Sequence, residues 1–174
     1  MKISGNKLRE AIRRWTVRRD TVHELFGDSL WFFDSEKEDR ENPETLMQKF
    51  QQADCAIAQL QVAQSDYNLK NQVDVSPHRD HGKMTLSEAI KRVGGVGRAE
   101  KMWRTAASSK SADRGYRDPT VRSKDEEHAK KAVQPSVAAN FAAEAARLAS
   151  QYRAAISSAN NVEIDLHVDA KLFE

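Results

Sequence analysis

The chain has 174 residues and a mass of 19.6 kDa, with 39% hydrophobic side chains, 31% charged side chains and a mean hydropathy of −0.74. It has no apolar run of about 18 residues, which excludes a membrane-spanning helix, and only 7 Gly and 4 Pro, which disfavours a turn-rich β-sandwich. The single cysteine, Cys55, excludes an intrachain disulfide, so we expect a cytoplasmic protein. The net charge of the chain is only +2.

The charge is divided into zones along the chain. Residues 1–20 carry a net charge of +5, residues 24–44 carry −6, and residues 91–124 carry +7. Runs of like charge are ordinarily solvated faces. The third zone differs from the other two because aromatic side chains lie among its bases.

Apolar residues at steps of three and four predict a first helix over about residues 4–33. It ends in an apolar cluster, Trp31-Phe32-Phe33, which we expect to be buried against a partner subunit because an exposed patch of this kind would promote aggregation.

The sequence Asn42-Pro43-Glu44 is a strong helix start and predicts a second helix over residues 43–71. Its apolar residues follow a heptad pattern that becomes polar after Leu60, with Asn71 on the packed line and Asn68 beside it. Two interpretations stay open: these amides fix the register of packed helices, or they line a ligand pocket at a subunit junction.

Residues 72–84 predict a loop with a very short strand at 72–75, and Thr85-Leu-Ser-Glu88 is a capping box that opens a third helix over about residues 86–107. Three glycines, Gly94, Gly95 and Gly97, lie in the middle of that helix. They indicate a weak point, a close helix–helix approach or room for a ligand.

A basic loop is predicted at residues 108–123, followed by a fourth, alanine-rich helix at 136–159. Residues 162–168 then alternate apolar and polar, which is typical of a half-buried strand. One strand cannot stand alone, so we expect it to pair with residues 72–75 or with a neighbouring subunit.

Together these elements predict an all-α fold. We expect residues 1–174 to form a single helical domain, a bundle of long antiparallel helices built on a helical hairpin, with a short β appendage. Long amphipathic helices in so thin a subunit leave apolar surface uncovered, so we also expect a homo-oligomer.

The order of these landmarks resembles the septicolysin-like family, small helical bacterial and phage proteins of largely unknown function. The resemblance is carried by short motifs along nearly the whole chain: Asn42-Pro43-Glu44, Asn68 with Asn71, Asp80-x-Gly82-Lys-x-Thr85-Leu86, Arg92, the Arg117 and Arg122 loop trailed by Glu126 and Glu127, and Ile156-x-x-Ala159-Asn160. The resemblance implies a helical fold, with Arg92 in a basic pair of the family.

No arrangement of residues predicts catalysis or metal binding. His78 and His81 have the spacing of a ligand pair, with Asp80 between them and His128 elsewhere in the chain, but no second pair with matching spacing exists. Cys55 has no histidine at a helpful helical spacing. We therefore expect no catalytic residue, no metal, no cofactor and no enzymatic activity.

The basic zone offers the one candidate site, because guanidinium groups grip phosphate and aromatic rings stack on bases. Its candidate ligand-binding residues, with the amides of the second helix, are Arg117, Arg122, Tyr116, Arg92, Arg98, Trp103, Asn68 and Asn71. The expected function is non-enzymatic capture of a small phosphorylated, nucleotide-like ligand between subunits. A phage or bacterial sponge that sequesters a nucleotide immune signal would fit this composition.

Two alternatives remain. The second hypothesis is a structural or protein-interaction bundle without a small ligand, whose basic loop docks on the acidic residues 34–44 of a partner. The third hypothesis is weak nucleic-acid binding, which a net charge of only +2 does not favour.

Overall fold

The computed structural model describes residues 1–31, 41–75, 82–109 and 132–173. Within these ranges the chain is mostly helical, as predicted, with two small two-stranded sheets. The helices are α1 (Gly5–Ser29), α2 (Pro43–Lys70), α3 (Leu86–Ser108) and α4 (Pro135–Ala159), and the strands are β1 (Lys2–Ser4), β2 (Gln72–Asp74), β3 (Lys83–Thr85) and β4 (Glu163–Asp165).

The chain divides into two compact units. Residues 1–89 and 155–174 form the first unit, and residues 90–154 form the second. Helix α3 begins in the first unit and continues into the second, and α4 returns from the second unit to the first. The expectation of a single domain over residues 1–174 stays a prediction.

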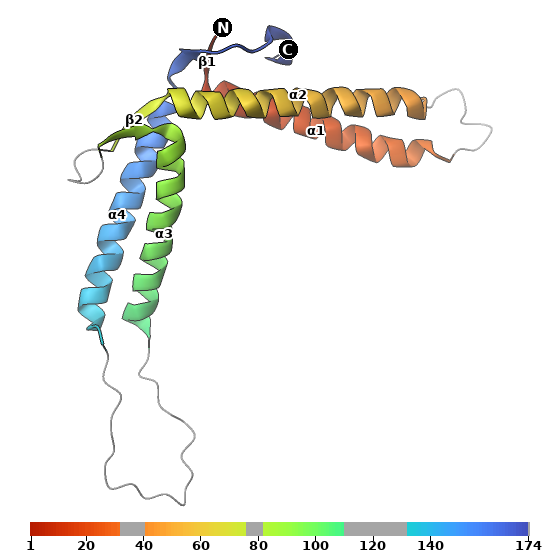
Figure 1. Cartoon of the computed structure of the whole chain (residues 1–174). Coiled ribbons are helices and arrows are strands. Elements are labelled where there is room, and N and C mark those ends of the chain that lie inside the picture. Colours follow the sequence, from red (N-terminus) through yellow and green to blue (C-terminus); the bar gives the residue numbers. More distant parts are fainter. Residues whose placement is uncertain (32–40, 76–81, 110–131, 174) are drawn as a thin grey trace, which may run out of the picture. The chain divides into compact units, whose positions relative to one another are not determined.

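Helices α1 and α2 form an antiparallel hairpin in the first unit (Figure 1). Its core holds apolar side chains at the predicted spacing, among them Leu8, Ala11, Leu46, Ala53, Ile57 and Leu60. The small alanines allow the two backbones to approach closely. As predicted, Asn42 caps α2, and its side chain accepts a hydrogen bond of 2.8 Å from the N–H of Glu44.

The pairing expected for the C-terminal strand was wrong. Strand β4 covers only residues 163–165 and pairs antiparallel with β1 of the same chain, with Ile3 opposite Ile164, while residues 72–74 pair with β3. Strand β1 is only three residues long, too short for a strand pattern to be recognised, so the helical periodicity assigned Ser4, its last residue, to the first helix. The half-buried Ile164 therefore finds its partner within the subunit.

The end of α4 is held by a buried group of hydrogen bonds, which we call the Tyr67 junction (Tyr67, Asn71, Ala159 and Val162). The Tyr67 hydroxyl lies 2.7 Å from the carbonyl oxygen of Ala159 and 2.8 Å from that of Val162. The Asn71 amide donates to the Ala159 carbonyl at 2.8 Å and to the Tyr67 hydroxyl at 2.9 Å. These bonds satisfy carbonyl groups that a helix end otherwise leaves without partners.

The first turn of α1 packs directly on this junction. A Cβ added to Gly5 would lie 2.5 Å from Asn160 Oδ1 and 2.7 Å from Tyr67 Cε1. The N–H of Asn6 donates to the Asn160 carbonyl at 3.1 Å, and the Asn160 amide donates to the Ile156 carbonyl at 2.7 Å. Glycine is therefore the residue that lets α1, α2 and α4 meet here.

We expect Gly5→Ala to lower the free energy of unfolding by about 1–3 kcal/mol, the typical cost of overpacking, because hydrogen bonds hold both clashing side chains in place. Gly27→Ala is the matched control in the same helix: apart from the helix's own backbone, no atom of the described residues lies within 4 Å of its added Cβ, so this variant should gain up to about 1 kcal/mol. Chemical denaturation of the two variants beside the unchanged protein measures both effects. Equal stability of all three proteins would contradict the packing described here.

Candidate functional site

The predicted site residues fall into three groups. Tyr116, Arg117 and Arg122 lie outside the described residues, as do His78, Asp80, His81, His128, Phe32, Phe33 and all of the basic loop beyond residue 109. Asn68 and Asn71 belong to the first unit, and Arg92, Arg98 and Trp103 belong to α3 in the second unit.

Asn71 is a structural residue of the first unit. It is 5% exposed, and its amide nitrogen donates to two acceptors of the Tyr67 junction. Its backbone N–H donates to the Tyr67 carbonyl at 2.9 Å, and its own carbonyl accepts from the N–H of Leu86 at 2.8 Å. Asn71 thus joins the ends of α2 and α4 to the start of α3, whereas Asn68 is only half-buried.

The three glycines of α3 lie on an open stretch of a continuous helix. Their N–H groups fall within the regular hydrogen bonding of that helix. A close helix–helix approach is also not seen: nothing described lies within 4 Å of a Cβ added to Gly97, and only the Arg98 guanidinium lies that near at Gly94 and Gly95.

The Arg98 guanidinium lies over this bare backbone. Its Nη1 is 3.7 Å from the Cβ position of Gly94, and its Nη2 is 4.0 Å from that of Gly95. Among the described residues, no carboxylate forms an ion pair with Arg98, whereas Arg104 of the same helix pairs with Glu100 at 2.9 Å. Arg98 is therefore an exposed guanidinium without an acidic partner among the described residues, and it lies beside the helix backbone at Gly94 and Gly95, which carry no side chains.

Helical spacing extends this feature into a basic face of α3, made of Lys91, Gly94, Gly95, Arg98 and Lys101. Lys91 precedes Arg98 by seven residues and Lys101 follows it by three, so the three cations share one side of the helix, and all are exposed. Arg92 lies roughly 120° away around the helix. Lys91 was missed as a candidate, although its i, i+7 relation to Arg98 is visible in the sequence.

Trp103 contributes to packing within the second unit. Its ring lies against Phe141 of α4, with a centroid distance of 4.9 Å and an interplanar angle of 35°. The indole is half-buried, so one of its faces is used in the contact between α3 and α4.

The basic zone of residues 1–20 serves the fold of the first unit. Four of its five arginines have partners along α1 or beyond it: Arg9 on Asn6, Arg14 on the Phe173 carbonyl, Arg18 over the Trp15 ring, and Arg19 with Asp20 and Asp54. The hydrogen bond from Arg19 to Asp20 raises the pKa of this guanidinium above its ordinary value. Trp15 also donates to the Leu172 carbonyl at 2.9 Å, so this zone anchors the C-terminal tail.

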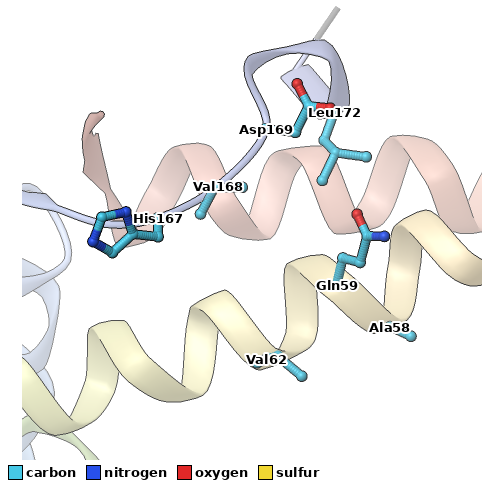
Figure 2. A pocket seen from close by; sticks show the side chains of 7 residues that line it. All are labelled: Ala58, Gln59, Val62, His167, Val168, Asp169 and Leu172. Carbon is cyan, nitrogen blue, oxygen red and sulfur yellow. The ribbon is translucent and has the colours of Figure 1, made fainter.

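A shallow groove of about 410 Å³ lies between α2 and the tail in the first unit. Its lining is mainly apolar and comes from Ala58, Gln59 and Val62 on one side and His167, Val168, Asp169 and Leu172 on the other (Figure 2). Across the described ranges, no three His, Cys, Asp or Glu side chains are grouped to hold a metal ion. No helix in these ranges has the length and apolar character needed to cross a membrane.

Comparisons with known proteins support the fold alone. No family model matches the sequence, and no curated protein is significantly similar to it. A solved structure of a functionally unknown conserved protein from Corynebacterium diphtheriae is similar, with a TM-score of 0.63 and 17% identity over 95% of this chain and 100% of that chain.

We expect Asn71→Ala to lower the free energy of unfolding by roughly 1–3 kcal/mol, because the Ala159 carbonyl and Tyr67 hydroxyl lose a buried donor. Asn68→Ala, in the same turn of α2 but half-buried, should change it by less than about 0.5 kcal/mol. Urea denaturation of both variants tests this difference. Equal effects of the two substitutions would show that the junction does not depend on the Asn71 amide.

Proposed function

We propose that this protein is a non-enzymatic, oligomeric binding protein that captures a small anionic, nucleotide-like ligand, in the manner of a phage or bacterial sponge for a nucleotide immune signal. The observation that carries the proposal is the Arg98 guanidinium, which lies beside the bare backbone of Gly94 and Gly95 without a described carboxylate partner.

The chemistry of this basic face suits a phosphorylated ligand with a flat ring. A guanidinium is always charged and binds phosphate through two parallel hydrogen bonds, and Lys91 and Lys101 add positive charge on the same side. The glycines carry no Cβ, so a ring could approach the helix backbone closely. The helix supplies its side chains to the ligand, while its backbone N–H groups remain within the helix.

The oligomeric part of the proposal rests on the small core of the second unit. Among its described residues, the buried side chains are Ala138, Ala142, Ala149 and Tyr152. Large apolar side chains remain exposed on both of its helices, including Met102 at 73% and Phe141 at 44%. Helices of this kind need a further packed layer, which other copies of the chain would supply.

Calorimetry of a panel of mononucleotides and cyclic dinucleotides at 200 mM salt tests the ligand. We expect saturable binding that Arg98→Ala weakens about 10- to 100-fold, which corresponds to the roughly 1.5–3 kcal/mol of a charge-assisted hydrogen bond. Arg104→Ala is the matched control, since this exposed arginine of the same helix is already paired with Glu100, and it should bind as the unchanged protein does.

Two results would overturn the proposal. Heat from none of the nucleotides would favour a structural or interaction bundle without a small ligand. Tight DNA binding that falls steeply with salt would favour the nucleic-acid alternative, because counterion release gives that dependence.

A further inference from the structure

Helix α2 carries a second regular stripe on the face opposite its core. The buried line includes Leu46, Ala53, Ile57, Leu60 and Tyr67. The other line, which we call the outer stripe, consists of Met47, Gln51, Cys55, Ala58, Val62, Ser65 and Leu69, at steps of four, four, three, four, three and four. All seven residues are exposed, and Val62 and Leu69 are 71% and 62% exposed.

The outer stripe contains no charged residue over about six turns. A helix with one buried face ordinarily carries charged side chains on the other. Here Lys49, Asp54 and Asp66 all lie off the stripe. Steps of three and four with uncharged residues are typical of a helix that packs on another helix, so the stripe has the pattern of an interface.

Two pairs of positions in the outer stripe lie at equal distances from Ala58, whereas Cys55 and Val62 lie three and four residues from it. Met47 and Leu69 each lie eleven residues from Ala58, and Gln51 and Ser65 each lie seven residues from it. An antiparallel copy of the same helix therefore places Met47 opposite Leu69 and Gln51 opposite Ser65. The smallest apolar residue, Ala58, then faces itself, where two backbones must approach most closely.

We propose that α2 pairs antiparallel with α2 of a second copy of this chain through the outer stripe, with Ala58 on the two-fold axis. A two-fold axis makes one surface serve both partners, and the two equidistant pairs of positions in the outer stripe fit this arrangement. The inference rests on the oligomeric part of the proposed function and is independent of the ligand.

The surroundings of the stripe suit this occupant. The antiparallel alignment places Asp66 beside Gln48 and Gln52 of the second copy, so carboxylates do not face one another across the pair. The groove of Figure 2 opens beside Ala58 and Val62, and its apolar Val168 and Leu172 widen the contact near the axis. The stripe is roughly 33 Å long, about three heptads, which is long enough for a stable helix pair.

Cysteine cross-linking tests both the surface and the direction of pairing. In a Cys55→Ser background of the full chain, we expect Ala58→Cys to form a disulfide-linked dimer under mild oxidation. Met47→Cys alone and Leu69→Cys alone should stay uncoupled, whereas a refolded mixture of these two variants should give the mixed dimer. Strong cross-linking of Met47→Cys with itself, or no dimer from Ala58→Cys, would overturn the antiparallel pair.

Sedimentation velocity at micromolar concentration supplies a measurement without cross-links. Val62→Glu should raise the concentration for half-assembly at least tenfold, with an unchanged circular dichroism spectrum because Val62 is mostly exposed. Thr45→Glu adds the same charge to an exposed position of α2 that lies off the stripe and away from Asp66 of the second copy, and it should assemble normally.

The outcomes separate this inference from the proposed function. If Val62→Glu assembles like the unchanged protein, the α2 pair is wrong while oligomerisation stands. If the unchanged protein sediments as a 19.6 kDa monomer, both the pair and the oligomer are wrong. Nucleotide binding by Arg98 is measured separately and decides neither.

Discussion

The hydroxyl group of Tyr67 is the point on which the first unit depends. It lies within hydrogen-bond distance of the carbonyl oxygens of Ala159, the last residue of α4, and of Val162, and the Tyr67 side chain is fully buried. A buried carbonyl left without a donor costs about 1–3 kcal/mol, a large part of the stability of a domain of this size. Gly5 packs on the Tyr67 ring, so the start of α1 also contacts this residue. The ends of α1, α2 and α4 and the β1–β4 sheet are therefore positioned together.

Three of the four helices could be predicted closely because their signals are local, whereas α1 ends at Ser29, four residues before its expected end at residue 33. Apolar steps of three and four, the Asn42-Pro43 start and the capping box at Thr85 each act within a few residues, and α2, α3 and α4 lie within one residue of their expected ends. The partner of β4 could not be predicted, since Ile3 and Ile164 find each other only in the folded chain. The heptad pattern of α2 likewise marked its inner line and left its outer one unnoticed.

The candidate site divides in the same way. Arg98 lies beside Gly94 and Gly95 because i+4 and i+3 spacing brings these residues to one side of α3, so this proximity is one that a sequence pattern can indicate. The role of Asn71 was beyond such reasoning, because its acceptor, the Ala159 carbonyl, is 88 residues away in the chain. An amide side chain on the packed face of a helix can bind a ligand, pair with a partner helix or cap the end of another helix. Only the folded structure shows that the Asn71 amide binds the end of α4.

The position of Tyr67 also sets the order of events during synthesis. Its two carbonyl partners follow it by 92 and 95 residues, with the whole second unit translated in between. At about 5–20 residues per second, roughly 5–20 s pass before the ribosome supplies them. Until those residues are made, the Tyr67 hydroxyl and the Asn71 amide lack their acceptors, so the end of the α1–α2 hairpin acquires these hydrogen bonds only after the second unit has been synthesised.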